Sequence, residues 1–180
     1  MSPMGSDPTT RVATAADIPV LMPLMQAAIT DLLSPVLTPE QVESSRMIMG
    51  IDTQLITDGT YFVVEIDGEI AGCGGWSRRN TLYGGDHTPG RAPALLDPAT
   101  EPARVRAMYT APAFTRRGVG RAILDAAEAA ARAEGFKAVE LAATMGGLPL
   151  YRACGYRDVE AFTDASGGAP VPLVRMRKPL

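Results

Sequence analysis

A strand, a helix and a second strand follow one another over residues 104–143, and this unit limits the chain to a small set of folds. Residues 104–110 are rich in strand-forming side chains, and residues 115–134 place apolar side chains at helical spacing before Gly135 ends the run. Residues 137–143 return to a strand pattern. A helix is the usual crossover between parallel strands, so the unit predicts a parallel or mixed sheet with helices packed on it.

Two helices are predicted upstream of this unit. Residues 14–17 read Thr-Ala-Ala-Asp, a capping box that opens a helix through about residue 29. Pro23 falls inside that helix, so a kink or a late start is expected there. Residues 38–41 read Thr-Pro-Glu-Gln, which combines a capping pattern with proline at the first helical position. This second helix should run to about residue 49.

A β-hairpin is predicted after these helices. Residues 61–66 are β-rich, Asp67-Gly68 is a two-residue turn signal, and residues 70–76 resume an extended run. Residues 81–102 contain several glycines and prolines and no apolar period, which indicates a long, functional loop. The other predicted elements are short: a strand at 11–13, a helix at 148–154, and strands at 156–162 and 171–176 with a turn at 166–168.

Composition favours one globular domain. The chain has 180 residues, of which 46% are hydrophobic and 21% charged, close to the average of globular proteins and unlike a disordered chain. Residues 1–10 are expected to form a flexible tail and residues 11–180 a single domain. The two cysteines fit no metal spacing, no secretory pattern is visible, and no apolar run is expected to cross a bilayer. A cytoplasmic protein without a metal or a membrane partner is expected.

Charge is distributed unevenly along the chain. Residues 1–100 carry 5 Lys/Arg and 12 Asp/Glu, whereas residues 101–180 carry 12 Lys/Arg and 8 Asp/Glu. An anionic ligand would therefore favour the C-terminal part and a cationic ligand the N-terminal part, unless both surfaces are merely solvated.

The loop before the longest predicted helix has the features of an anion site. Gly118 and Gly120 let backbone amides face outward without a Cβ in the way, and the helix N-terminus adds free N–H groups and the positive end of its dipole. Arg116, Arg117 and Arg121 add fixed charge, which favours phosphate binding over a merely solvated helix start. The segment is neither a P-loop, which ends in Gly-Lys-Ser/Thr, nor a dinucleotide fingerprint, which needs a third glycine.

Three stretches, taken in order, resemble the GNAT superfamily of N-acetyltransferases. Residues 108–112, Met-Tyr-Thr-Ala-Pro, are similar to its fourth strand, and residues 116–121, Arg-Arg-Gly-Val-Gly-Arg, to its acetyl-CoA pyrophosphate loop. Residues 150–156, Leu-Tyr-Arg-Ala-Cys-Gly-Tyr, are similar to its tyrosine-bearing helix and the Gly-aromatic pair after it. The motifs cover about residues 104–160, and the element order matches over nearly the whole chain. The resemblance implies an α/β (α+β) fold: a mixed, mostly antiparallel twisted sheet of about 6–7 strands with about 4 helices on both faces.

The resemblance also implies positions for acetyl-CoA as cosubstrate. In such enzymes a bulge separates the fourth strand from its neighbour, so that a backbone amide faces the thioester carbonyl. Met108, Tyr109 and Thr110 would run along the pantetheine arm, and Thr144 stands where the family often has an asparagine that bonds this arm. The pyrophosphate would be held by loop amides with two arginines beside them: Gly118, Val119, Gly120, Arg121, Arg116 and Arg117.

One loop position departs from the family pattern. Thr115 stands three residues before the first loop glycine, where the family usually has Gln or Arg. We expect Thr115 to cap the following helix, while Arg116 and Arg117 supply the missing charge.

The implied reaction is direct attack of a neutral amine on the acetyl thioester. A backbone N–H near Tyr109 would stabilise the oxyanion of the tetrahedral intermediate, an effect worth about 10²–10³ in rate. Tyr151 matches the tyrosine often assigned as general acid, and protonation of the leaving CoA thiolate is worth about 10²–10⁴. The alternative role for Tyr151 is that of an aromatic side chain packed in the core.

The sequence does not single out a general base or the residues that contact the acceptor. Four side chains are candidate bases: Glu65, Asp86, His87 and Glu101. His87 is the only histidine, and its pKa range suits proton transfer. His87 and Trp76 are also candidate acceptor contacts, with an exposed bystander and a core aromatic as their respective alternatives.

Three functions follow from these observations. The first is an N-acetyltransferase that acts on a primary amine of a small molecule or a peptide. The second is a non-catalytic CoA-binding or sensor module of the same fold, against which the presence of Tyr151 argues. The third is a nucleic-acid binder, which the net charge of -3 and the lack of an aromatic-basic platform oppose. A homodimer, common among similar proteins, is kept as a further expectation.

Overall fold

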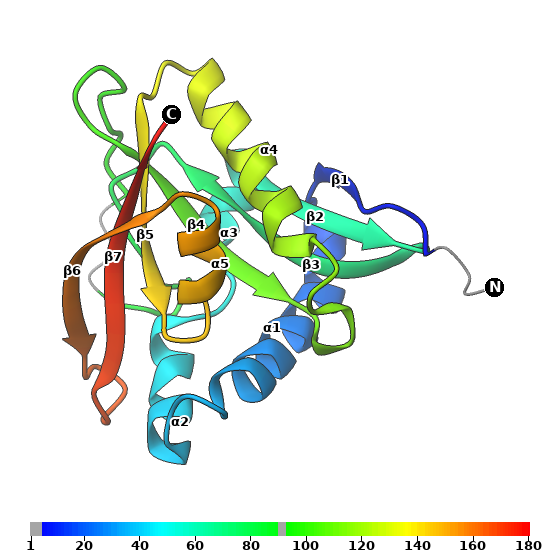
Figure 1. The fold of residues 1–180 in the computed structure, drawn as a ribbon, viewed down its shortest axis with the longest axis vertical. Helices are drawn as coiled ribbons and strands as arrows, with labels where there is room; N and C mark the ends of the chain where they lie inside the picture. The colour runs from blue at the N-terminus through cyan, green and yellow to red at the C-terminus, as the bar shows by residue number, and fades with distance from the viewer. Residues whose placement is uncertain (1–4, 90–92) are drawn as a thin grey trace.

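The computed structural model describes residues 5–89 and 93–180, and in them a seven-stranded sheet has helices on both faces (Figure 1). Residues 1–4 of the expected tail and residues 90–92 of the expected 81–102 loop lie outside the described part. Two short 3₁₀ turns, Ala15–Asp17 and Pro112–Phe114, accompany the helices and strands. In chain order the helices and strands are β1 (Thr9–Val12), α1 (Ile18–Leu33), α2 (Pro39–Ile48), α3 (Thr53–Thr57), β2 (Tyr61–Ile66), β3 (Glu69–Ser77), β4 (Ala103–Thr110), α4 (Val119–Ala133), β5 (Ala138–Thr144), α5 (Leu148–Ala153), β6 (Arg157–Asp164) and β7 (Val171–Pro179).

The sheet is mixed and mostly antiparallel, as the family resemblance implies. Its strand order is β1-β2-β3-β4-β5-β7-β6. Only β4 and β5 are parallel neighbours, and α4 is the crossover that joins them. The strand–helix–strand unit therefore forms the centre of the sheet.

Each face of the sheet has its own core. On one face, Leu21 and Met25 of α1 pack with Tyr61 of β2, and α2 and α3 contribute to the same cluster. On the other face, Leu124 of α4 packs with Leu141 of β5, and α5 completes that cluster. In Figure 1, α4 and α5 lie in front of the sheet. The helices that precede β2 thus cover one face of the sheet, and the helices that follow β4 cover the other.

Both predicted capping patterns are present. The Thr38 side chain accepts a hydrogen bond from the Gln41 amide at 3.2 Å, and the Thr38 amide donates to the Gln41 side chain at 2.9 Å. At the first pattern, the Asp17 carboxylate accepts from the Thr14 amide at 2.8 Å. The helix that follows begins at Ile18 and continues through Pro23, so the expected late start at the proline is wrong.

Two element boundaries and one short helix differ from the sequence-based expectation. α4 begins at Val119, not near 115, because Gly118 takes a left-handed conformation with φ of 80° and is the N-cap. Thr115 is therefore not the cap, and its hydroxyl donates to the Pro112 carbonyl at 3.3 Å. β1 begins at Thr9, within the residues expected as a tail, because it pairs with β2. The short helix α3 was not predicted.

The segment Ala15–Leu33 is long and apolar enough to span a membrane by length and composition, contrary to the sequence-based expectation. In the fold it lies against the sheet, where Leu21, Met25 and Ile29 are buried. A helix of this kind packed in a protein core passes the same test of length and composition.

Candidate active site

The central strands β4 and β5 separate after a short stretch of pairing. They pair only at Ala103 with Val139 and at Arg104 with Glu140. Beyond that point β4 follows β3 and β5 follows β7, and Figure 1 shows their C-terminal ends diverging near α5. The backbone groups of β4 that face β5 therefore have no partner strand beyond Arg104, and they are available to a ligand.

A bulge in β4 accompanies this separation. Cys73 pairs with Tyr109 but Gly75 pairs with Arg106, so β4 carries one residue more than β3 over this stretch. Ala107 at the bulge has φ of 50°, and its carbonyl accepts a hydrogen bond from the Tyr61 hydroxyl at 2.6 Å. The bulge expected from the family resemblance is thus present.

Glycine in β3 makes the bulge sterically feasible. A Cβ on Gly74 would lie 2.6 Å from the sulfur of Met108 and 2.8 Å from a methyl carbon of Ile123. The sequence therefore leaves room for both the bulged strand and α4 at this position.

Two cavities meet where β4 and β5 separate. The first, which we call the α1 cavity, has about 140 Å³ and lies between α1, β4 and α5. The second, which we call the loop cavity, has about 70 Å³ and lies between residues 82–84, β4, β5 and β7. Five residues line both cavities: Met49, Met108, Tyr109, Thr144 and Tyr151.

Tyr151 occupies the boundary between the two cavities. Its side chain is buried at 9% exposure, and its ring meets Tyr156 edge-on with centroids 5.8 Å apart. No described residue bonds its hydroxyl, so this group is available to a ligand. Burial raises the pKa of Tyr151 well above its usual range, and the phenol stays protonated at neutral pH. A protonated phenol at this point can act as a proton donor.

The loop before α4 presents backbone amides next to the α1 cavity. The first intrahelical bond joins the Ala122 amide to the Gly118 carbonyl at 3.0 Å, so the preceding amides have no partner within the helix. Gly120 lines the cavity, and a Cβ there would lie 2.5 Å from Leu150. A glycine at this position therefore lets α5 approach α4 closely.

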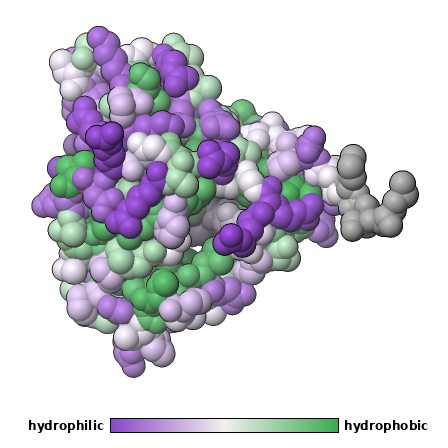
Figure 2. Space-filling model, viewed as in Figure 1, coloured by the Kyte–Doolittle hydropathy of each residue, from purple (hydrophilic) through white to green (hydrophobic). Residues whose placement is uncertain are grey.

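Three arginines, Arg116, Arg117 and Arg121, lie in the same segment of the chain as these amides. Within residues 5–89 and 93–180, no ion pair is formed by Arg116, Arg117 or Arg121, and Arg117 stacks its guanidinium 5.5 Å from the ring of Phe114. Figure 2 shows hydrophilic side chains beside a hollow near the start of α4, and an apolar strip over α1 below it. Amides, a helix dipole and unpaired guanidiniums together favour an anion.

The structure brings half of the ten residues predicted to contact acetyl-CoA to one cavity. Met108, Tyr109, Thr110 and Thr144 line the α1 cavity together with Gly120. The Tyr109 hydroxyl accepts a hydrogen bond from the Gly50 amide at 2.8 Å, which ties β4 to the segment after α2.

Trp76 and His87 are not brought to these cavities. Trp76 is buried at 2% exposure and packs edge-on against Phe136, with ring centroids 5.9 Å apart. His87 is exposed, and its Nε2 lies 2.6 Å from the Arg46 carbonyl. Neither residue lines the α1 cavity or the loop cavity. The expected acceptor contacts of Trp76 and His87 are therefore not supported, and Trp76 is a core residue.

The carboxylates considered as general bases are engaged elsewhere. Glu65 pairs with Arg11 at 3.0 Å. Asp86 accepts a hydrogen bond from the Thr53 amide at the start of α3, and Glu101 accepts one from the Asp97 amide. None of these carboxylates lines either cavity.

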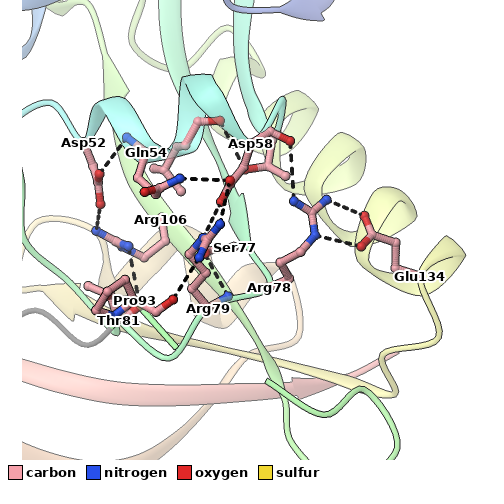
Figure 3. A network of polar contacts seen from close by, with 12 residues as sticks. Asp52, Gln54, Asp58, Ser77, Arg78, Arg79, Thr81, Pro93, Arg106 and Glu134 are labelled. Atoms are coloured by element: carbon pink, nitrogen blue, oxygen red, sulfur yellow. Dashed lines mark hydrogen bonds and ion pairs between the residues drawn. The ribbon is translucent and has the colours of Figure 1, made fainter. Parts of the chain in front are cut away.

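Sequence reasoning missed Arg106, a buried cation on the wall of the loop cavity. Its guanidinium donates to the Asp52 carboxylate at 2.9 Å and to the Gly84 carbonyl at 2.8 Å. Figure 3 shows Arg106 between Asp52 and Thr81, beside the separate pairs Arg79–Asp58 and Arg78–Glu134. The only signal in the sequence was a charged residue at an inward-facing position of a strand.

Tyr83 was also missed. It lines the loop cavity, and its hydroxyl donates to the Asp164 carboxylate at 2.6 Å. Its place in a glycine-rich loop gave no periodic signal.

Two separated central strands, a helix start with amides that lack intrahelical partners and a buried tyrosine lie around these two cavities. The chain belongs to the acetyltransferase (GNAT) family, whose model matches residues 26–156. It is therefore an acetyltransferase of that family. No curated protein matches the chain significantly.

Solved structures of N-acetyltransferases share this fold at low sequence identity. One is a GCN5-related N-acetyltransferase from Rhodopseudomonas palustris, with 19% identity, 98% of each chain covered and a TM-score of 0.73. Another is the PaiA N-acetyltransferase of Thermoplasma acidophilum in complex with coenzyme A, with 13% identity, 97% and 100% covered and a TM-score of 0.65. A third is yncA of Salmonella typhimurium with its cofactor acetyl-CoA, with 16% identity, 97% and 95% covered and a TM-score of 0.65.

Proposed function

We propose that this protein transfers the acetyl group of acetyl-CoA to a primary amine of a small molecule or a peptide, by direct attack of the amine. The observation that carries the proposal is that Tyr151 lines both the α1 cavity and the loop cavity, while no described residue bonds its hydroxyl. Two ligands that enter from the two cavities would meet at this hydroxyl.

The residues of the α1 cavity fit acetyl-CoA, which supplies the acetyl thioester when bound. The amides of residues 118–121 would hold the pyrophosphate, with Arg116 and Arg117 beside them. Apolar side chains of α1 and α5, Leu32 and Leu150 among them, would cover the pantetheine arm. The backbone of β4 beyond the bulge would bond that arm, and Thr144 adds a hydroxyl. The complexes of the Thermoplasma and Salmonella proteins with coenzyme A and acetyl-CoA support this assignment.

Two groups of this chain would lower the barrier to acetyl transfer. A backbone N–H of β4 near Tyr109 would stabilise the negative charge on the acetyl oxygen, because the bulge frees one side of this strand. Tyr151 would donate its proton to the departing sulfur, and its raised pKa keeps that proton in place until transfer. The loop cavity would hold the acceptor amine on the other side of Tyr151.

Ligand binding and turnover test the proposal in sequence. We expect acetyl-CoA and CoA, but not NAD, to raise the Tm by several degrees, since a ligand at about 100 times its Kd adds about 2.7 kcal/mol. Thiol release measured with a panel of primary amines then tests transfer. Stabilisation without thiol release from any amine would favour the non-catalytic CoA-binding module. A folded, ligand-free sample that neither CoA compound stabilises would overturn the assignment of the cavity.

The loop arginines should contribute to affinity and not to turnover. We expect the double variant Arg116→Ala/Arg117→Ala to weaken acetyl-CoA binding about tenfold or more, since each charge-assisted hydrogen bond is worth about 1.5–3 kcal/mol. Turnover at saturating acetyl-CoA should be unchanged. Isothermal titration at two salt concentrations measures both affinity and its screening.

Arg132→Ala is the matched control, because Arg132 is exposed in the last turn of the same helix. Its effect on affinity should stay below about twofold. An equal loss in the control and the double variant would show that general charge, and not this loop, attracts the cofactor.

A further inference from the structure

An amine substrate needs a group that removes its proton, and the residues of the loop cavity restrict which group can do so. A primary amine is protonated at neutral pH and attacks only after it loses a proton. Among the described residues that line this cavity there is no carboxylate and no histidine. Arg106 is permanently protonated, and Tyr151 is the proposed donor. Tyr83 and Tyr109 are the remaining tyrosines on the cavity wall.

Of these two tyrosines, only Tyr83 forms a hydrogen bond with a carboxylate among the described residues. The Tyr83 hydroxyl donates to Oδ2 of Asp164 at 2.6 Å. Oδ1 of the same carboxylate accepts from the Ser166 amide at 2.8 Å, which fixes its position at the end of β6. The Tyr109 hydroxyl instead meets the backbone amide of Gly50. A proton that reaches Tyr83 thus has an onward path that Tyr109 lacks.

Packing against Phe162 holds the Tyr83 ring, and the surroundings of Tyr83 and Asp164 set which of the two carries the proton. The Tyr83 ring lies 6.0 Å from that of Phe162, centroid to centroid. Burial and the neighbouring Asp164 raise the pKa of Tyr83 to about 12, so the phenol is neutral. Partial burial opposes ionisation of Asp164, but hydrogen bonds from Ser166 and Tyr83 outweigh it and hold the pKa of this carboxyl below its usual value. A neutral phenol therefore faces an ionised carboxylate.

We propose that Tyr83 and Asp164 form a proton relay that deprotonates the acceptor ammonium. One N–H bond of the ammonium breaks, and its electron pair stays on nitrogen as the lone pair that attacks. After the attack a second proton leaves the nitrogen and restores the Tyr151 phenol, which has given its own proton to the departing sulfur. The proton released before the attack binds the Tyr83 oxygen while the original Tyr83 proton moves to Oδ2 of Asp164. Asp164 is only partly buried and passes the proton to water. Tyr83 is the catalytic residue of this step, and Asp164 acts through it.

This inference rests on the proposed function and narrows its substrate class. The relay is useful only to an acceptor that arrives as a cationic primary amine. An amine that is already neutral in solution gains nothing from it.

A series of amines with similar size and falling basicity tests the relay. Ethylamine, 2-fluoroethylamine, 2,2-difluoroethylamine and 2,2,2-trifluoroethylamine run from protonated to neutral at a single pH near neutrality. We expect Tyr83→Phe to lower kcat/KM for ethylamine about 10²-fold, in the range of a lost general base. The loss should shrink along the series to less than about twofold for trifluoroethylamine. The Tm shift with acetyl-CoA should stay unchanged.

Two further variants separate the relay from packing. Asp164→Asn keeps an acceptor for the Tyr83 hydroxyl but cannot take up the proton, and it should reproduce the basicity-dependent loss. Tyr156→Phe removes another phenol that bonds a carboxylate, Glu128 at 3.4 Å, but one that lines neither cavity. This variant should change kcat/KM by the same factor for all four amines.

The outcomes are distinguishable from those of the proposed function. Thiol release by the unaltered protein with any amine of the series supports amine acetylation, and its absence over the whole series overturns the relay together with that function. If the unaltered protein is active and Tyr83→Phe loses the same factor with every amine, the relay is wrong while amine acetylation stands.

Discussion

Replacing Tyr151 by phenylalanine is expected to lower the rate of acetyl transfer by about 10²–10⁴-fold, the usual range for a lost general acid. The variant removes only the hydroxyl, and the ring keeps its edge-on contact with Tyr156 and its place between the two cavities. Because no described residue bonds that hydroxyl, the free energy of unfolding should change by less than about 0.5 kcal/mol, as for substitutions that break no contact. Acetyl-CoA should bind with its affinity within about twofold of the original.

Single-turnover thiol release at saturating acetyl-CoA is the measurement, because it reports transfer and not product release. Tyr156→Phe is a suitable control, since it removes a buried hydroxyl that lies outside both cavities, and only a small change in rate is expected from it. If Tyr151→Phe transfers the acetyl group at the original rate, Tyr151 has a packing role and the proton reaches the leaving sulfur by another path.

Features written in short stretches of sequence could be predicted. The glycine-containing helix start after Arg117, the capping pattern at Thr38 and the hairpin turn at Asp67-Gly68 each depend on neighbouring residues, and all are present. The mixed sheet followed from one strand–helix–strand unit, because few topologies accommodate it. Even there the start of α4 was misplaced, since the left-handed conformation of Gly118 ends the loop later than the apolar period suggested.

Features that depend on distant pairs could not be predicted. Arg106 and Asp52 are 54 positions apart, and Tyr83 and Asp164 are 81 positions apart, so neither pair leaves a periodic pattern in the chain. His87 was attractive by its chemistry, but its loop folds against the end of α2 and carries it away from the two cavities. The loop cavity, where the acceptor amine would bind, is therefore the part of the site that is hardest to predict from the sequence.

Replacing Asp52 by asparagine is expected to lower the free energy of unfolding by about 3–5 kcal/mol, the cost of removing one partner of a buried ion pair. The two groups lie 2.9 Å apart, and both side chains are 2% exposed. Asparagine keeps the size of the side chain and an oxygen that can accept from the Gln54 amide at the start of α3. It leaves the guanidinium of Arg106 opposite a neutral amide, and a guanidinium cannot escape this by losing its proton. Urea unfolding with linear extrapolation measures the loss.

Asp158→Asn is the matched control, because it breaks the pair of Arg152 and Asp158 at 2.6 Å, whose side chains are 54% and 46% exposed. An exposed pair is worth about 0–1 kcal/mol, so this variant should retain nearly all of its stability. Arg106 also donates to the Gly84 carbonyl on the wall of the loop cavity. Loss of Asp52 should therefore raise KM for the amine more than it weakens acetyl-CoA binding. A destabilisation no larger than that of Asp158→Asn would show that other groups neutralise Arg106, and that Asp52 serves α3 alone.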